Sequence, residues 1–161
     1  MPATPSADAP VVRIETSMGA IRVRLDRAHA PRTVENFLRY VGESFYDGTI
    51  FHRVIDDFMI QGGGYTSGMA RKQTHEPIAL EISPALRHVD GAIAMARTND
   101  PNSATAQFYI CDGPQSGLDD SYAPFGVVIE GMDVARAIAS TPTGPGDVPR
   151  TEVTIRSIRS E

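Results

Sequence analysis

From residue 49 to about residue 131, the chain is a series of short β-forming runs separated by glycine, proline, aspartate and asparagine. The runs lie at residues 50–55, 59–61, 78–82, 92–96, 108–111 and 126–129. Many short strands with turn residues between them are typical of an all-β sandwich or barrel. This pattern restricts the fold class more than any other feature of the sequence.

The segment before this region predicts a β-hairpin. In residues 21–26 apolar and charged side chains alternate, which is the pattern of a half-buried strand. Residues 11–16 form a second run, and residues 17–20 supply a short turn between the two. A last strand is predicted over residues 153–156.

Two segments follow the helical period instead. One apolar stripe has the spacing i, i+3, i+4 and i+7 and consists of Val34, Phe37, Leu38 and Val41. Pro31 lies near the start of this helix and Gly42 ends it, and a second helix fits residues 132–139. About eight strands and two helices predict a mainly β fold, because closing a sheet removes its exposed edges. We expect a closed eight-stranded antiparallel β-barrel whose open ends are capped by two α-helices.

Composition excludes several classes of protein. The 161 residues suffice for one domain, and the net charge of −5 argues against a nucleic-acid partner bound through a basic face. No apolar run approaches the roughly 18 residues of a membrane span. Residues 1–10 contain three prolines, so we predict a flexible tail before a domain at residues 11–161. This tail lacks the pattern of a secretory signal, so the expected location is cytoplasmic.

Several motifs are given a structural interpretation. No Lys-Ser or Lys-Thr pair and no helix follow Gly62-Gly63-Gly64, which indicates a tight bend at a strand end rather than a phosphate loop. The four histidines lack the spacing of metal ligands, so no metal is expected. Cys111 is interpreted as a small core residue, and Asp119 and Asp120 as solvated turn residues.

Two apolar runs are interrupted by polar side chains. Arg53, Met59 and Gln61 have the same strand parity, unless Asp56 and Asp57 shift the register. The common interpretation of such an arginine is a side chain on the solvent face of its strand. The second interrupted run, residues 106–110, favours a different interpretation. It places an amide and a tyrosine on one face of the strand and core residues on the other. Two such strands suggest an apolar pocket with a few convergent polar groups.

These same segments resemble the cyclophilin-type peptidyl-prolyl cis–trans isomerases. The most specific stretch begins with Phe51-His52-Arg53 and ends with Gln61-Gly62-Gly63. Further blocks match in the family's order, at residues 31–37, 91–96, 102–103, 106–110, 125–128 and 131–132. The resemblance extends over residues 12–158 and implies an eight-stranded barrel with two helices. It also implies rotation about Xaa-Pro bonds in proline-containing peptides and in unfolded or folding proteins, without cofactor or metal.

The resemblance assigns roles to individual residues. Arg53 would donate to the prolyl nitrogen, and Gln61 would bond the peptide backbone near the moving carbonyl. The apolar seat for the proline ring would consist of Phe58, Met59, Tyr109 and Leu118. The residues that border the groove for the preceding part of the peptide would be Ala96, Arg97 and Gln107. His52 would either contact the substrate or support the site.

Four positions depart from the cyclosporin-sensitive eukaryotic members. By this resemblance Gly117 stands in place of tryptophan, Arg97 of asparagine, Tyr109 of phenylalanine and Tyr122 of histidine. We therefore expect an active isomerase that binds cyclosporin weakly, with Tyr122 still contacting substrate. Small size is compatible with a monomer. The alternatives are a catalytically weak proline-peptide binding module or chaperone on the same fold, and an unrelated barrel that holds a small apolar ligand.

Overall fold

The computed structural model describes residues 9–161. The predicted tail at residues 1–10 therefore lies outside the described residues, apart from its last two. The carbonyl oxygen of Pro10 accepts a hydrogen bond of 2.8 Å from the backbone N–H of Leu25, which ties the start of the first strand to its neighbour.

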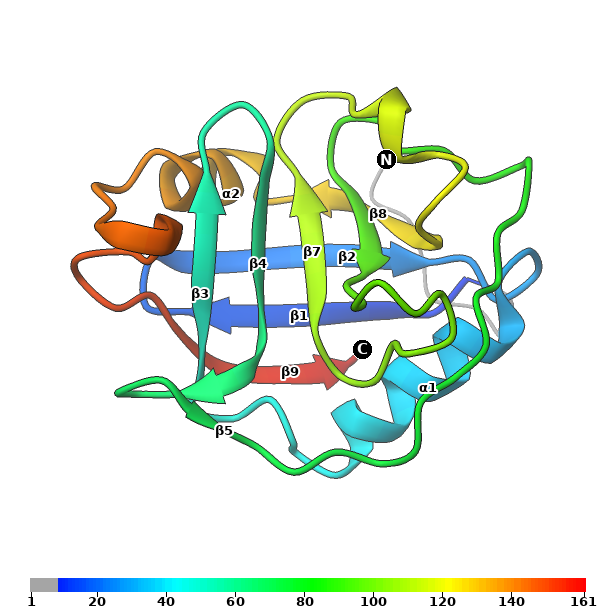
Figure 1. Cartoon of the computed structure of the whole chain (residues 1–161), viewed down its shortest axis with the longest axis horizontal. Helices are drawn as coiled ribbons and strands as arrows, with labels where there is room; N and C mark the ends of the chain where they lie inside the picture. Colours follow the sequence, from blue (N-terminus) through cyan, green and yellow to red (C-terminus); the bar gives the residue numbers. More distant parts are fainter. Residues whose placement is uncertain (1–8) are drawn as a thin grey trace.

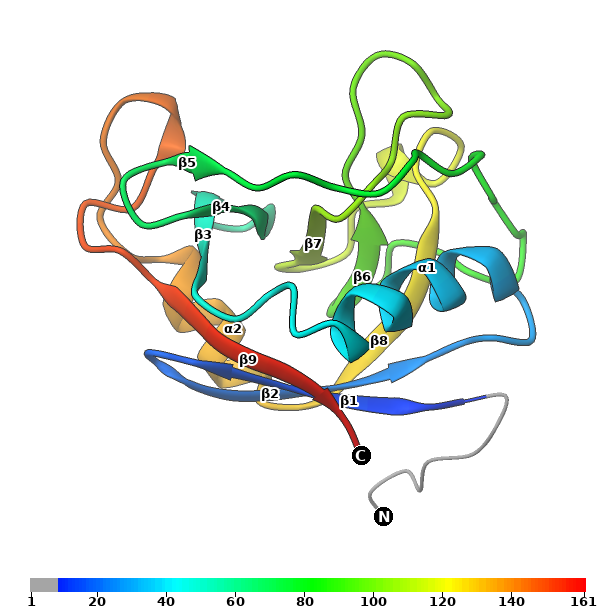
Figure 2. The same ribbon diagram turned by 90° about the horizontal axis from the view of Figure 1, so that it is seen from below.

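Eight antiparallel strands close into a barrel in the order β3-β9-β1-β2-β8-β6-β7-β4, with β4 pairing back to β3 (Figures 1 and 2). A two-residue strand, β5 (Ala70–Arg71), adds to the edge of β4. The barrel strands are β1 (Val11–Thr16), β2 (Gly19–Leu25), β3 (Thr49–Ile55), β4 (Met59–Thr66), β6 (Ala92–Met95), β7 (Phe108–Cys111), β8 (Pro124–Glu130) and β9 (Thr154–Ser160). The predicted closed eight-stranded barrel is confirmed.

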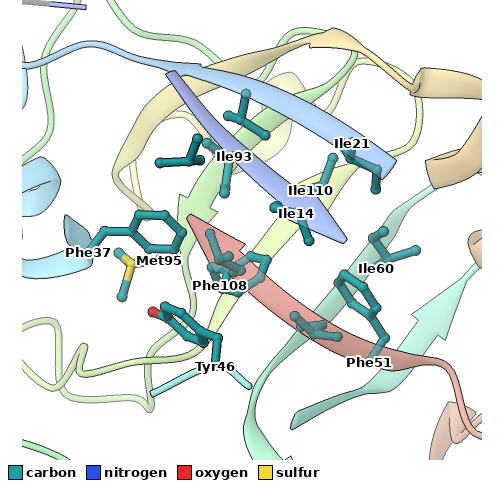
Figure 3. Packing of buried hydrophobic residues seen from close by; sticks show 14 of the residues in the cluster. Ile14, Ile21, Phe37, Tyr46, Phe51, Ile60, Ile93, Met95, Phe108 and Ile110 are labelled. Atoms are coloured by element: carbon teal, nitrogen blue, oxygen red, sulfur yellow. The ribbon is translucent and has the colours of Figure 1, made fainter. Parts of the chain in front are cut away.

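Alternate side chains of these strands fill the barrel. Figure 3 shows inward-facing residues of the strands packed together in the barrel interior, with Phe37 of the first helix beside Met95 at one side of the cluster. Phe37 makes an edge contact with Phe108, with the ring centroids 5.6 Å apart. Buried side chains from the strands and from α1 fill this interior, as is usual in a barrel of eight strands.

The two helices lie at opposite ends of the barrel (Figure 1). Helix α1 spans Pro31–Gly42 and α2 spans Met132–Ala139, as the apolar spacing predicts. No side chain of the preceding residues caps α1; instead the carboxylate of Glu81 accepts the backbone N–H groups of Arg32 and Thr33, at 3.3 and 2.9 Å. A carboxylate at this end stabilises the helix because the first N–H groups have no partner within it.

The strand predicted at residues 78–82 is wrong. Only Ile78 forms an isolated bridge, with Ala104, and the backbone N–H of Leu80 donates to the side-chain oxygen of Asn102 at 3.0 Å. Glu81 in the same segment caps α1. The apolar alternation is present, but the backbone groups bond to separate partners rather than to one neighbouring strand.

The bend predicted at Gly62-Gly63-Gly64 is also wrong, because all three glycines lie inside β4. Gly63 has a φ of 91° at an irregular stretch of the β3–β4 register, which a residue without Cβ adopts freely. The absence of side chains here lets neighbours approach the strand: a Cβ on Gly64 would lie 2.5 Å from the side chain of Gln107.

Within residues 9–161, no helix is long and apolar enough to cross a membrane.

Candidate functional site

Outward-facing side chains of four neighbouring strands form a row across the barrel wall. Arg53 of β3 pairs with Gln61 of β4, Gln61 pairs with Tyr109 of β7, and Tyr109 pairs with Ala94 of β6. Directly paired residues on one face have Cβ atoms about 4.5–5.5 Å apart, so these side chains are neighbours. The shared parity expected of Arg53, Met59 and Gln61 therefore agrees with the register.

A second apolar cluster covers this outer face. Its buried members are Met59, Ala92, Ala94, Tyr109 and Cys111, with Phe58, Ala96, Leu118 and Tyr122 among the half-buried residues packed against them. The strand β7 is thus buried on both faces, one toward the barrel interior and one toward this outer cluster. Leu118 and Tyr122 come from a short 3₁₀ turn (Ser116–Leu118) and the residues after it.

The cluster surrounds a hollow of about 120 Å³, here called the apolar hollow. It is lined by Arg53, Phe58, Met59, Gln61, Ala96, Arg97, Tyr109, Leu118 and Tyr122. All nine are residues that the sequence analysis assigns to the site; the other two, His52 and Gln107, do not line it. Pockets for whole small ligands usually hold about 300–1,000 Å³, so this hollow suits a single side chain or ring.

Arg53 brings a free cation to the rim of the apolar hollow. Its side chain is exposed, and no hydrogen bond or ion pair joins its guanidinium to another residue among 9–161. A guanidinium carries five N–H donors in a rigid plane and stays protonated at any physiological pH. All five are therefore available to a bound molecule.

Gln61 and Gln107 are joined side by side next to Arg53. The Nε2 of Gln61 donates to the Oε1 of Gln107 at 3.0 Å, and the side chain of Gln107 rests on Gly64. This bond leaves the Oε1 of Gln61 and one of its N–H groups free to bond a ligand. Gln107 lines an adjoining hollow rather than the apolar one.

His52 lies behind the site. The side chain is 8% exposed, its ring packs against Tyr65 with centroids 4.6 Å apart, and its buried Nδ1 has no hydrogen-bond partner in the described structure. Burial, with a further contribution from the charge of Arg53, lowers the pKa of His52 to about 4. The imidazole is therefore neutral at physiological pH.

Tyr109 is held from behind by a chain of hydrogen bonds. Its hydroxyl lies 2.7 Å from Nε2 of the buried His88, and Nδ1 of His88 lies 2.8 Å from Oδ1 of Asp119. The pKa of Asp119 is lowered, chiefly by the backbone N–H and then the ring of His88. A carboxylate oxygen can only accept, so Nδ1 of His88 is the donor to Asp119, and Nε2 is then the ring atom that accepts from the hydroxyl of Tyr109. The interpretation of Asp119 as a solvated turn residue is wrong.

A second hollow of about 100 Å³ adjoins the first, and it is here called the polar hollow. It is lined by Gln61, Arg71, Ala96, Arg97, Thr98, Ser103, Thr105 and Gln107. Arg71 and the three hydroxyl residues were not predicted from the sequence as part of the site. Arg71 lies on β5, which is too short to leave a periodic pattern; the block at residues 102–103 was the available signal for the loop.

Two other sets of potentially functional side chains, an aspartate cluster and a cysteine, have structural roles. Carboxylate oxygens of Asp56, Asp57 and Asp112 lie within 4.8 Å of one another, the spacing of a possible cation site. Both oxygens of Asp112 are occupied, one by Arg136 and one by the backbone N–H of Asp57, each at 2.9 Å. Cys111 is buried, which raises the pKa of its thiol to about 12 and leaves it protonated.

A closed antiparallel barrel capped by two helices, with an apolar hollow on its outer wall, defines a distinct class of β-barrel proteins. Residues 11–160 match the family described as cyclophilin type peptidyl-prolyl cis-trans isomerase. The chain belongs to this family.

Relatives in sequence and in structure agree with this assignment. The chain is 49% identical to the peptidyl-prolyl cis-trans isomerase cyp18 of Streptomyces antibioticus, over 92% of this chain and 96% of the relative. It is 44% identical to peptidyl-prolyl cis-trans isomerase B of Escherichia coli K12, over 92% and 98%. A crystal structure of a Cryptosporidium parvum cyclophilin type isomerase, solved in the presence of the dipeptide Ala-Pro, superposes with a TM-score of 0.83 at 28% identity, over 94% and 98%.

Proposed function

We propose that this protein is a peptidyl-prolyl cis–trans isomerase that accelerates rotation about Xaa-Pro bonds in peptides and in unfolded or folding proteins. The observation that carries the proposal is the unpaired guanidinium of Arg53 in register with Gln61, at the rim of an apolar hollow sized for one ring. The relatives carry this activity in their names, and one related structure was solved in the presence of Ala-Pro.

The barrier that such an enzyme lowers is electronic. Amide resonance gives the C–N bond partial double-bond character and a rotation barrier of about 18–20 kcal/mol. A hydrogen bond to the prolyl nitrogen holds the lone pair on nitrogen and so weakens the resonance. The nitrogen becomes a good acceptor only as the bond twists, so the donor stabilises the transition state more than the planar ground state.

Arg53 is the donor that the site supplies. Its charge is permanent, its donors are unengaged, and it stands beside the hollow rather than within it. The proline ring would occupy the apolar hollow, in contact with Phe58, Met59, Tyr109 and Leu118. With the ring fixed, the preceding carbonyl rotates, and the free amide groups of Gln61 bond the peptide backbone there.

The remaining side chains border the substrate. Ala96, Arg97 and Gln107 would flank the residues before the proline, and Tyr122 would close the rim of the apolar hollow. His52 would support Arg53 from behind, in keeping with its buried ring. The reaction makes and breaks no covalent bond, so the mechanism needs no electron acceptor, nucleophile or bound metal.

The alternatives fit less well. A catalytically weak binding module or chaperone needs the apolar hollow but does not require an unpaired cation placed directly beside a half-bonded amide. A barrel for a small apolar ligand needs an internal chamber, whereas this interior is filled by side chains. Both observations favour the isomerase.

The test is a proline-peptide isomerisation assay on Arg53→Ala. Loss of one preorganised donor to a transition state typically costs about 10²–10³ in rate, and we expect a fall in kcat/KM of that order. Arg53→Lys should recover little, because a single ammonium replaces the planar fork. Arg156→Ala removes the same charge from an exposed position on β9 and should match the wild type. Equal rates for Arg53→Ala and wild type would refute the mechanism.

Peptide binding separates the isomerase from the binding module. Arg53→Ala keeps the apolar lining, so an Ala-Pro peptide titrated into the variant should still shift the NMR signals of residues around the hollow. A wild-type protein that binds the peptide without accelerating its isomerisation would establish the binding module instead.

Three narrower properties are also proposed. Cyclosporin should bind weakly because Gly117, the residue before Leu118 of the apolar hollow, supplies no aromatic side chain. A monomeric state and a cytoplasmic location stay predictions from the sequence. Sedimentation and cell fractionation test them.

A further inference from the structure

The polar hollow continues the groove beyond the seat of the proline ring. Gln61, Ala96 and Arg97 line both hollows, so a peptide that leaves one along this side enters the other. The lining changes from aromatic and aliphatic groups to guanidinium groups, amides and hydroxyls. The two hollows are therefore suited to contact chemically different parts of one bound peptide.

The groove is a positive region of an acidic protein. Three arginines line the two hollows, Arg53, Arg71 and Arg97, and none of the lining residues is aspartate or glutamate. The whole chain carries a net charge of −5. Several arginines outside the hollows form ion pairs with carboxylates; Arg136, for example, pairs with both Asp90 and Asp112.

The guanidinium of Arg97 is fixed at the border between the hollows. Its Nε and Nη2 donate to the carbonyl oxygen of Ser121 at 3.0 and 2.7 Å, and its Nη1 donates to that of Thr98 at 2.8 Å. It also lies 4.6 Å from the ring centroid of Tyr122. These partners hold the cation without neutralising it and leave two of its five N–H donors free.

Arg71 is the second arginine that lines the polar hollow. It is exposed on β5, and within residues 9–161 no carboxylate forms an ion pair with it. The nearby Asp100 lines neither hollow, and its side chain accepts the backbone N–H of Asn102 at 2.9 Å. Two uncompensated guanidinium groups thus face one small polar space.

We propose that Arg71 and Arg97 select substrates with an aspartate or glutamate side chain in the segment before the proline. This inference rests on the proposed function, which seats the proline ring in the apolar hollow and the preceding residues toward Gln107. A carboxylate suits two guanidinium groups because it accepts paired N–H donors in plane. Since Arg97 is already ordered, pairing with it costs less conformational entropy than pairing with a mobile side chain.

The experiment compares peptides that differ only in the side chain at one position before the proline. Glutamate, glutamine or lysine is placed in turn at each of the three positions before the proline, and kcat/KM is measured on the wild-type protein. A solvent-exposed ion pair corresponds to roughly a two- to fivefold effect, so glutamate should exceed glutamine by about that factor at one or more positions, and lysine should be slowest. The advantage should shrink between about 0.01 M and 1 M salt, because salt screens exposed charges.

Two controls locate the effect. Glutamate placed after the proline should give no advantage over glutamine. Arg71→Gln should move the glutamate-to-glutamine ratio toward one, whereas Arg156→Gln removes an equal charge outside both hollows and should leave the ratio unchanged.

The outcomes separate this inference from the function on which it rests. If the wild-type protein accelerates none of the peptides, the proposed isomerase function fails. If it accelerates the glutamine peptides but glutamate gives no advantage before the proline, or the advantage is undiminished in Arg71→Gln, the acidic preference alone is overturned.

Discussion

The hydroxyl of Tyr109 lies 2.7 Å from Nε2 of His88, so a wall of the apolar hollow is anchored to a buried imidazole. The rings are nearly parallel, with an interplanar angle of 10°. Burial of the hydroxyl raises the pKa of Tyr109 far above its usual range, which keeps it protonated and able to donate. The extra hydroxyl thus fixes the orientation of the ring rather than adding a charge.

We expect Tyr109→Phe to change the binding of substrate more than the rate of bound substrate. The aromatic ring remains, but Nε2 of His88 loses its partner, and an unsatisfied buried group costs about 1–3 kcal/mol of stability. KM should rise while kcat stays within about twofold. His88→Gln should add little to KM in the Tyr109→Phe background, and full additivity in that double-mutant cycle would contradict the anchoring role.

Gly64→Ala should impair activity without unfolding the barrel. A Cβ there would lie 2.5 Å from the side chain of Gln107, which must move and release the amide of Gln61. A lost hydrogen bond of about 0.5–1.5 kcal/mol corresponds to a roughly two- to tenfold fall in kcat/KM.

Gly63→Ala is the matched comparison for Gly64→Ala. At its φ of 91° a Cβ would lie 2.8 Å from the ring of Tyr46, so the cost falls on the core. We expect it to lower the free energy of unfolding by about 1–3 kcal/mol, as overpacking does. Thermal unfolding measured beside activity distinguishes the two, and equal destabilisation by both would contradict the assignment.

His52 should make the protein less stable in mild acid. Its pKa is about 4 in the folded state and 6.5 in an unfolded chain, so the unfolded state binds the extra proton first as the pH falls. Stability from this group is complete above pH 6.5 and is lost as the pH falls toward 4, by about 1–3 kcal/mol. Urea unfolding of wild type and His52→Phe at pH 7 and pH 4.5 measures the difference. Identical losses in the two proteins would mean that His52 does not titrate in this range.

Gly117→Trp should create a tighter cyclosporin site. A Cβ at Gly117 meets no atom within 4 Å, so a side chain can be added at this position, beside Leu118 of the apolar hollow, without a clash at Cβ. Buried aromatic anchors dominate many binding interfaces, and we expect affinity to improve by about tenfold or more, with Gly117→Ala unchanged. The chain contains no other tryptophan, so quenching of the new fluorescence reports binding directly. An unchanged affinity would show that other departures in the groove set the weak binding.

The strands and both helices could be predicted because their spacing is local. The structure of residues 78–82 could not be predicted, because it depends on a contact between Glu81 and the start of α1, nearly fifty residues away along the chain. For the same reason, the hydrogen bond between Tyr109 and His88 could not be predicted from the sequence. His88 lies 21 residues before Tyr109, and no periodicity of the sequence connects the two. Only the folded barrel brings their side chains together.

The site residues were accessible to sequence reasoning in a different way. Parity placed Arg53 and Gln61 on one face, and they pair directly because the ladder runs without a shift from the Ile55–Met59 pair to this pair. The register shifts lie on the other side of Arg53, where the glycines in β4 permit an irregular pairing and also make room for Gln107. A run of glycines has no periodicity that predicts its pairing or its neighbours. Its role could therefore be recognised only in the folded structure.

The division of β7 between two faces has a consequence for how such a protein can diversify. Phe108 and Ile110 belong to the barrel interior, while Tyr109 and Cys111 belong to the outer cluster. Substitutions at the outward positions alter ligand recognition while the interior keeps its packing. New specificities can therefore be selected from libraries of alternate residues on this strand, with the scaffold held constant.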